Sequence, residues 1–250
     1  MIDTIDNHKS IRAYKTTPVE PDKLDVILTA ATRASNTGNM QAYSIVVTQD
    51  TTLREKLWEA HFKQNMVRQA PVHLTFCADF NRFTKWCEQR KADPGYDNFL
   101  SFLTGTIDAM LAAQNAAIAA ESLGLGICYL GTASWMADKL IEILHLPRLV
   151  VPILSMVVGY PDETPELTDR LPVTGIVHYE KYSDYEPSDI NRIYCDKEAL
   201  ESTRELLKIN GKESLAQIFT DNRYTRTDNR FFSRAFLQTL EAQGFMMNGD

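Results

Sequence analysis

The chain has 250 residues, of which 44% are hydrophobic and 24% are charged, and its formal net charge is −7 at pH 7. This length lies at the upper edge of a single domain, and the apolar share supports a substantial core. The acidic balance argues against nucleic acid or an anionic membrane surface as the main partner, because phosphate backbones select for a basic face. A small ligand stays compatible, since a local basic pocket survives an acidic average.

The reactive residue types point to an intracellular protein without a metal. The four cysteines form no CxxC pair and no zinc spacing, so we predict buried, reduced thiols. The five histidines contain no i, i+4 pair, and no locally encoded metal site is expected. The start of the chain lacks the apolar region of a secretory signal, and its longest apolar stretch, 109–120, is too short and too polar to span a bilayer. These features predict a cytoplasmic protein.

Hydrophobic periodicity predicts alternating helices and strands through the first two thirds of the chain. A helix is expected where apolar residues recur every three or four positions, and a strand where β-branched residues cluster. In chain order the predicted elements are a helix over 21–34, a strand over 43–48, a helix capped by Asp50, a strand over 73–78, an alanine-rich central helix over 106–123 ended by Gly124, a strand over 127–130, a helix over 135–146 and a strand over 152–158. No βαβ period repeats, which favours an α+β fold over a doubly wound sheet.

The composition changes after Gly159 and again from Tyr179, where the chain becomes polar and rich in tyrosine. Weak helical patterns remain over 199–209 and 231–243. A segment with so few core residues must bury itself against surfaces that it does not provide. We therefore predict a core over 1–178 and a C-terminal extension over 179–250 that packs on the core and on a partner subunit.

Two polar segments flank the first long helix. His8-Lys9-Ser10-Ile11-Arg12 offers cationic and hydroxyl donors, and the segment 35–41 (SNTGNMQ) offers amide side chains and a glycine that allows close backbone approach. We expect the two to converge on one phosphate-bearing ligand. The chain has no GxSxG elbow, no Walker GK[ST], no HExxH and no Rossmann GxGxxG. Donors without an acid, base or nucleophile are typical of proteins in which an organic cofactor carries the reaction.

Four collinear segments resemble the nitroreductase superfamily, in particular its oxygen-insensitive NADPH-dependent nitroreductase and flavin reductase branch. They are HKSIRAY from His8, SNTGNMQAYS from Ser35, the stretch 108–131 and the stretch 165–182. The resemblance implies a three-layer fold, with a central, mostly antiparallel sheet flanked by helices. It also implies FMN bound at the interface of a homodimer, and a C-terminal extension that wraps the partner.

Individual residues take expected roles from this resemblance. Arg12 and Ser10 are expected at the flavin phosphate, Gln64 near the isoalloxazine ring and Arg170 at the phosphate. The full implied cofactor set is His8, Lys9, Ser10, Arg12, Asn36, Gln64, Tyr129, Leu130, Gly131, Thr132 and Arg170. One departure concerns the Lys-x-Arg that the branch has before Leu-Pro, where this chain has Thr168-Asp169-Arg170. The lost cation and added carboxylate predict weaker phosphate binding unless Lys9 compensates.

The implied activity is that of an FMN-dependent oxidoreductase, which uses NADPH to reduce nitroaromatics, quinones or free flavins by ping-pong hydride transfer. No protein side chain is assigned as catalytic, because the flavin carries the chemistry. Arg223 and Arg226 are expected to hold the 2′-phosphate of NADPH. Alternative functions are an FMN-binding carrier or sensor without turnover, a structural dimer that has lost its cofactor, and another flavin enzyme such as an enone reductase or a dehalogenase.

Several of these residues also have purely structural interpretations. Arg12 would be an ordinary surface arginine if it paired with Asp6 or Asp22. Asn36 suits a turn, and Tyr129 suits a core position. For Arg223 and Arg226 the alternative is a solvated basic turn.

Overall fold

The computed structural model describes residues 1–247 and divides the chain into two compact units. The first contains Met1–Glu166 together with the chain from Ser233 onward, and the second contains Leu167–Phe232. The sequence predicted a division at residue 178, whereas the boundaries of these two units fall after Glu166 and before Ser233. The end of the chain belongs with the first unit because Leu240 and Phe245 are fully buried there beside Phe102.

The first unit is built on a four-stranded sheet with the order β1-β2-β4-β3, in which every neighbouring pair is antiparallel. The strands are β1 (Tyr43–Thr48), β2 (Val72–Asp79), β3 (Gly126–Leu130) and β4 (Val150–Gly159). All eight residues of β2 are buried, because the strand is central and covered on both faces. The four strands predicted from β-branched runs are confirmed, and β2, β3 and β4 extend beyond the predicted ranges.

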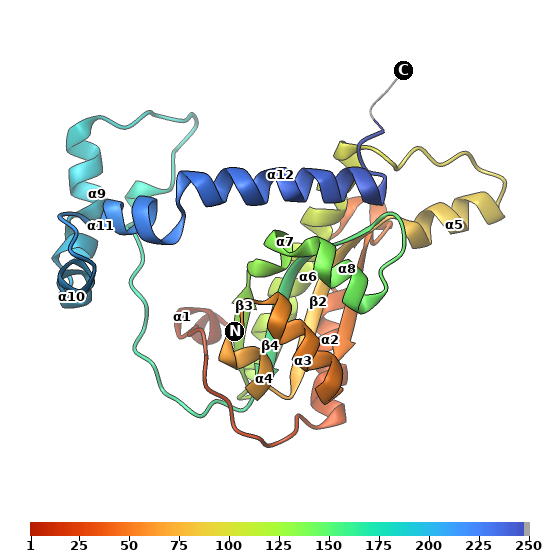
Figure 1. Ribbon diagram of the computed structural model, residues 1–250, viewed down its shortest axis with the longest axis horizontal. Helices are drawn as coiled ribbons and strands as arrows, with labels where there is room; N and C mark the ends of the chain where they lie inside the picture. The colour runs from red at the N-terminus through yellow and green to blue at the C-terminus, as the bar shows by residue number, and fades with distance from the viewer. Residues whose placement is uncertain (248–250) are drawn as a thin grey trace. The chain divides into compact units, whose positions relative to one another are not determined.

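Helices cover both faces of this sheet (Figure 1). On one face lie α2 (Pro21–Thr32) and α6 (Phe99–Ser122), and on the other α3 (Thr51–Ala60), α4 (Asn65–Gln69) and α8 (Ala137–Leu144). The predicted Asp50 cap is present, since its carboxylate accepts from Leu53 N at 2.7 Å. The buried alanines of α6 let the helix lie close to the sheet and to α2. The predicted three-layer α+β fold is confirmed.

Helix boundaries account for most departures from the predictions. Helix α6 begins at Phe99 instead of 106, because the Asn98 side chain caps it by accepting from Ser101 N at 3.0 Å. The single helix predicted over 135–146 is wrong. It is divided at Met136 into α7 (Thr132–Trp135) and α8, and α8 ends at Leu144, where His145 adopts a left-handed φ of 50°. The short helix α1 (Ile2–Asp6) and the helix α5 (Asn81–Gln89) were not predicted.

The C-terminal region contains more helix than its weak patterns predicted. After a 3-10 turn η2 (Val173–Gly175) follow α9 (Pro187–Ala199), α10 (Glu201–Asn210), α11 (Leu215–Gln217), the π-helical turn η3 (Ile218–Arg223) and α12 (Arg226–Gln243). Helix α9, which the periodicity missed, begins with a capping box between Glu186 and Asp189 and has Pro187 in its first turn. This capping stabilises the start of a helix whose apolar periodicity is too weak to predict it.

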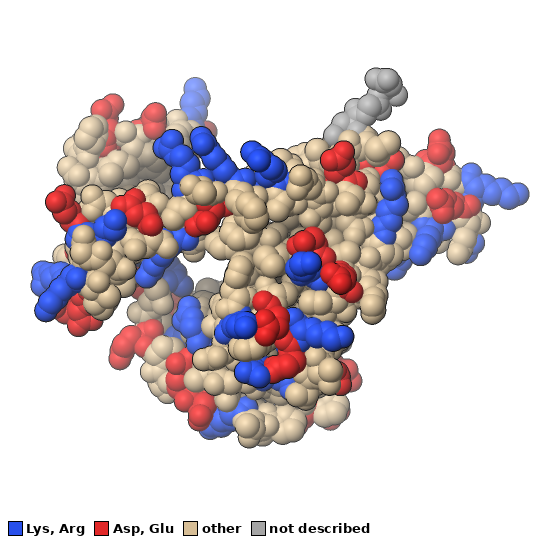
Figure 2. All heavy atoms as spheres, in the orientation of Figure 1, with Lys and Arg blue, Asp and Glu red and all other residues tan. Residues whose placement is uncertain are grey.

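The surface is strongly charged but mixed in sign. Figure 2 shows Lys and Arg interspersed with Asp and Glu on the face in view. Within residues 1–247, no helix combines the length and the apolar character needed to cross a bilayer.

Candidate functional site

The segment that contains His8 to Arg12 runs alongside β3. Ser10 pairs with Ile127 in a parallel bridge, and Ile11 N donates to Ile127 O at 2.8 Å. This approach requires a glycine at 126, because a Cβ there would lie 2.6 Å from Ile11 Cγ1. The polar segment is therefore fixed to the sheet through a buried isoleucine, with Ser10 and Arg12 on either side of it.

Glu163 holds the backbone of this segment from the other side. Its Oε1 accepts hydrogen bonds from Arg12 N and from Ala13 N, the latter at 3.0 Å. The Arg12 side chain is exposed, and among the residues that the structure describes its guanidinium donates only to Ser10 O, at 3.5 Å. No ion pair joins it to Asp6 or Asp22 within the described residues, so the structural alternative for Arg12 is not realised there. The guanidinium stays available to an anion.

His8 and Lys9 differ from Arg12 in what they contact. His8 Nδ1 lies 2.6 Å from Glu121 Oε1, so this ring nitrogen is engaged within the chain. Lys9 lines a cavity of about 400 Å³ together with Asn7, Glu121 and Pro161. Glu121 thus contacts His8 and lines the same cavity as Lys9.

The second predicted segment forms a tight loop with the 3-10 turn η1 (Thr37–Asn39). Asp108 of α6 stabilises this loop, since its buried carboxylate accepts hydrogen bonds from Thr37 N at 2.9 Å and from Ala42 N at 3.1 Å. Asn36 Oδ1 accepts from Gln41 N at 3.2 Å. Asn39 and Gln41 have left-handed φ values of 56° and 51°, a conformation that costs about 1 kcal/mol or more per residue. The Asn36 side chain therefore stabilises the turn, which is the structural alternative to a cofactor contact. The loop that contains it is strained.

The predicted cofactor residues at the end of β3 fall into two groups. The side chains of one group pack toward the core, and the residues of the other are accessible. The Tyr129 hydroxyl donates to Ala113 O at 2.8 Å, and Leu130 is buried in the core, so both side chains pack inward. Gly131 is exposed, and a Cβ there would have no atom within 4 Å. Thr132 opens α7, and its Oγ1 lies 3.4 Å from Gln64 Nε2. The structure thus brings Gln64 and Thr132 together, although 68 positions separate them.

Three functional candidates escaped the sequence analysis: His61, Asp108 and Glu163. His61 Nδ1 lies 2.7 Å from Thr132 Oγ1. Burial lowers the pKa of His61 to about 4, so the ring is neutral at physiological pH. A carboxylate in the alanine-rich helix was the available signal for Asp108. His61 and Glu163 gave no signal, because their partners are distant in sequence.

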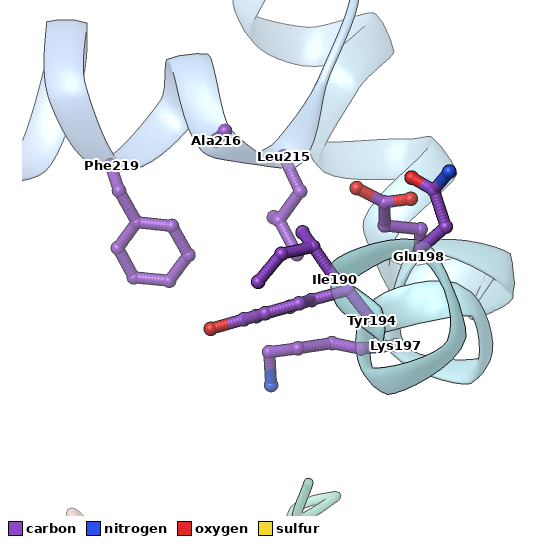
Figure 3. A pocket seen from close by; sticks show the side chains of 8 residues that line it. Ile190, Tyr194, Lys197, Glu198, Leu215, Ala216 and Phe219 are labelled. Carbon is purple, nitrogen blue, oxygen red and sulfur yellow. The ribbon is translucent and has the colours of Figure 1, made fainter. Parts of the chain in front are cut away.

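Arg170 lies in the second unit, in the segment that departs from the Lys-x-Arg pattern. Its guanidinium donates to Thr168 O at 3.1 Å and to Asp169 O at 3.0 Å. The unexpected carboxylate of Asp169 is paired with Lys197 of α9 at 2.5 Å. Lys197, together with Tyr194 and Phe219, also lines a pocket of about 200 Å³ (Figure 3). A cation thus lies beside Asp169, although the sequence pattern lacks one there.

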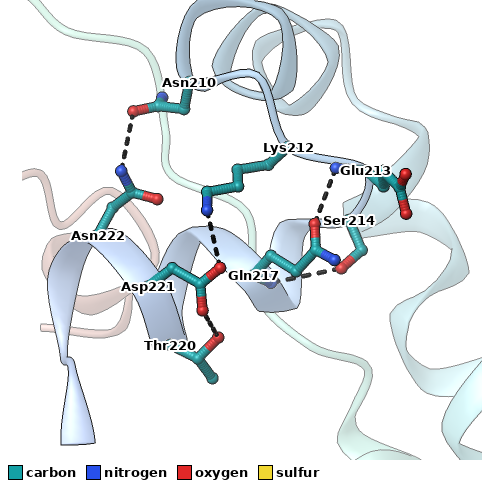
Figure 4. A network of polar contacts seen from close by, with 8 residues as sticks. All are labelled: Asn210, Lys212, Glu213, Ser214, Gln217, Thr220, Asp221 and Asn222. Atoms are coloured by element: carbon teal, nitrogen blue, oxygen red, sulfur yellow. Dashed lines mark hydrogen bonds and ion pairs between the residues drawn. The ribbon is translucent and has the colours of Figure 1, made fainter.

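The two predicted NADPH residues follow a compact polar network in the same unit. Lys212 Nζ donates to Asp221 Oδ2 at 2.8 Å, and Thr220 Oγ1 donates to Asp221 Oδ1 at 2.8 Å (Figure 4). Arg223 ends the π-helical turn with its guanidinium 5.6 Å from the centre of the Phe219 ring, and Arg226 begins α12. The network fixes the backbone just before Arg223.

Comparison with known proteins gives consistent matches. The profile described as "Nitroreductase family" matches residues 5–160. The FMN reductase [NAD(P)H] of Bacillus subtilis (strain 168) is 31% identical, over 98% of this chain and 97% of the relative. A crystal structure from Bacteroides fragilis NCTC 9343 is 50% identical with a TM-score of 0.96, over 98% of this chain and 99% of that one. The NADPH:FMN oxidoreductase of Vibrio harveyi, solved with NAD+, is 29% identical with a TM-score of 0.80, over 99% of both chains.

Proposed function

Because the chain belongs to the nitroreductase family, we propose that it is an FMN-dependent oxidoreductase, which uses NADPH to reduce nitroaromatics, quinones or free flavins by ping-pong hydride transfer. The names of its relatives support this proposal, since they include FMN reductase [NAD(P)H] and oxygen-insensitive NADPH nitroreductase. The structural observation that carries it is the accessible polar pair Gln64 and Thr132 at the end of β3.

The residues of the first unit suit the chemistry of FMN. Arg12 offers a guanidinium that makes one long hydrogen bond, to Ser10 O, within residues 1–247, and such a group suits a phosphate. Ser10 and Thr132 add hydroxyls, and Gln64 adds an amide. Gly131 leaves open space where a planar ring requires close backbone approach. When bound, the flavin supplies the hydride-accepting and hydride-donating centre.

The chain's own groups then bind and orient the cofactor. Within the proposed cofactor set, Arg12, Lys9, Ser10 and Arg170 act at the phosphate end, and Gln64, Gly131 and Thr132 act at the ring. The side chain of Leu130 is buried and that of Tyr129 is partly buried against the core, so their part is to support the backbone that precedes Gly131. His8 and Asn36 are engaged with Glu121 and Gln41, and they act by holding their segments in place.

A homodimer with FMN at its interface forms part of the proposal. Helix α6 presents an apolar stripe at spacings of three and four residues, and its members Leu100, Leu103, Ile107 and Met110 are 71%, 41%, 50% and 51% exposed. Apolar residues in this pattern are typical of a helix that packs on a second helix. The second unit also exposes large apolar side chains, among them Val173, Ile176 and Tyr179. We infer that the C-terminal extension embraces the partner subunit.

Arg223 and Arg226 are proposed to hold the 2′-phosphate of NADPH, which favours NADPH over NADH. We also propose that the protein acts in the cytoplasm. In support, all four cysteines are free thiols, and three of them are buried.

Anaerobic reduction tests the function directly. Purified protein is loaded with FMN, freed of unbound flavin and titrated with NADPH while the flavin absorption is recorded. The proposal requires yellow protein that bleaches with NADPH and recovers its colour on addition of a nitroaromatic or a quinone. Yellow protein that NADPH fails to bleach indicates a carrier or sensor, and protein that stays colourless after FMN addition contradicts the assignment.

A further inference from the structure

The turn between α3 and α4 places three polar groups in one hydrogen-bonded chain. Gln64 Nε2 lies 3.1 Å from His61 O and 3.4 Å from Thr132 Oγ1, and Thr132 Oγ1 lies 2.7 Å from His61 Nδ1. Gln64 and Thr132 belong to the proposed cofactor set, whereas His61 lies behind them with no exposed surface. His61 is thus the buried end of this series of hydrogen bonds.

The direction of the two hydrogen bonds that Gln64 makes follows from which of its atoms can donate. The amide nitrogen of Gln64 only donates, and its two partners are oxygens. Thr132 Oγ1 therefore accepts from Gln64, and it shares a second hydrogen bond with His61 Nδ1 in which either group can be the donor. This leaves Gln64 Oε1 as the free acceptor, which has no hydrogen-bond partner within residues 1–247.

The surroundings of His61 lock this arrangement. The ring is fully buried, and its centroid lies 5.2 Å from that of the equally buried His73. Because burial keeps the ring neutral, Nδ1 meets Thr132 Oγ1 as one half of an uncharged hydrogen bond. The following residues, Phe62 and Lys63, both adopt left-handed φ values of 54° and 58°. Two consecutive left-handed residues without glycine cost roughly 2 kcal/mol or more, and such strain persists where the surrounding structure enforces it. The strained turn returns the chain so that Gln64 meets Thr132.

We propose that His61 is a positioning residue for the flavin, one that orients the Gln64 amide through Thr132 so that Oε1 faces an N–H group of the isoalloxazine. This rests on the proposed FMN function. His61 itself touches no cofactor. Its role is to hold Thr132 Oγ1 in place through their 2.7 Å hydrogen bond, because a Thr132 side chain that turned elsewhere would leave the Gln64 amide free to rotate.

Two polar substitutions separate this role from mere filling of space. His61→Asn places an amide oxygen near the position of Nδ1, whereas His61→Gln places its amide near Nε2, away from Thr132. His61→Leu fills the site without an acceptor, and Thr132→Val removes the hydroxyl at constant volume. His73→Leu is the control, because it removes the neighbouring buried ring without touching Thr132 or Gln64.

The measurement is the dissociation constant of FMN from apoprotein, followed by quenching of flavin fluorescence. We expect His61→Gln, His61→Leu and Thr132→Val to weaken FMN binding about tenfold, as loss of one buried hydrogen bond predicts. His61→Asn and His73→Leu should stay within about threefold of the wild type. The double variant His61→Leu/Thr132→Val should bind as its single variants do, because both remove the same interaction.

Three results would overturn the proposal. They are wild-type affinity in His61→Gln, equal weakening by His61→Asn and His61→Gln, and additive losses in the double variant. If His61→Leu does not fold, the comparison of Asn with Gln decides the point by itself. Failure of the wild-type apoprotein to bind FMN would remove the proposed function and this inference together, whereas wild-type binding with unaffected variants removes only the inference.

Discussion

Lys197 Nζ lies 2.5 Å from Asp169 Oδ2, and the pair adjoins Arg170 in the second unit. Both side chains are about two thirds buried or more, with relative exposures of 26% and 32%, so the pair is shielded in part from solvent. The carboxylate of Asp169, which lies between Thr168 at the lysine position of the family pattern and Arg170, is therefore neutralised locally. Whether Lys9 compensates at the phosphate stays a prediction, and the observed partner of Asp169 is Lys197.

The first prediction concerns this pair. Lys197→Ala should weaken FMN binding several-fold, because an unpaired Asp169 carboxylate next to Arg170 repels a phosphate. The double variant Lys197→Ala/Asp169→Asn should recover most of the lost affinity, since it removes both charges. Fluorescence titration of the apoproteins measures both effects. Equal affinities for the single and double variants would show that the charge of Asp169 does not act on the phosphate.

The second prediction concerns Gly126. In Gly126→Ala the new methyl group would lie 2.6 Å from Ile11 Cγ1, so the segment with Ser10 and Arg12 must move away from β3. We expect a loss of about 1–3 kcal/mol in the free energy of unfolding, together with weaker FMN binding. Gly95→Ala is the matched control, because a Cβ there meets no atom within 4 Å. Urea denaturation and FMN titration of both variants check the prediction, and an unaffected Gly126→Ala variant would contradict it.

The third prediction is acid lability from the buried histidines. Burial lowers the pKa of His61 to about 4, and for His73 burial, helped by His61 and Arg54, lowers the pKa well below its usual value. In the unfolded chain both rings take up a proton near pH 6.5. Stability is therefore complete above about pH 6.5 and falls as the pH decreases toward 4, by about 3 kcal/mol for His61 alone.

Urea midpoints of the apoprotein between pH 4 and 7.5 measure this loss. His61→Asn should flatten the profile, because the asparagine does not titrate. An identical pH dependence in that variant would exclude His61 as the cause.

The fourth prediction tests the apolar stripe of α6. Ile107→Glu places a carboxylate in the middle of the stripe, and burying it at an interface without a partner is unfavourable. We expect a shift from dimer to monomer in sedimentation or multi-angle light scattering, and loss of bound FMN. Thr52→Glu in the first turn of α3 adds the same charge at an exposed position away from the stripe and should keep the dimer. A dimeric Ile107→Glu variant would place the interface elsewhere.

The fifth prediction concerns selection between nicotinamides. Arg223→Ala should raise the KM for NADPH roughly tenfold and leave the KM for NADH nearly unchanged, because only NADPH has a 2′-phosphate. Arg204→Ala removes another exposed arginine of the same unit, one that is paired with Glu201, and it serves as the control. Steady-state kinetics with both donors measure the effect. Equal changes with NADPH and NADH would remove the proposed role of Arg223.

The amino-acid sequence alone determined the elements whose stability is local. The four strands follow from their β-branched runs, and the Asp50 cap and the buried alanine face of α6 follow from short-range patterns. The resemblance of four segments indicated the family, because those segments keep their order along the chain. Capping and left-handed residues shifted the helix boundaries, and these depend on single side chains that periodicity does not register.

Only the tertiary structure decided which polar residues meet. Gln64, Thr132 and His61 are joined by hydrogen bonds, and Glu163 reaches the backbone of Arg12 across 151 positions. The same folding directs Tyr129 and Leu130 into the core, and it pairs Asp169 with Lys197. Contacts of this kind arise from packing between layers, which brings together residues whose separation in the chain has no relation to their distance in space.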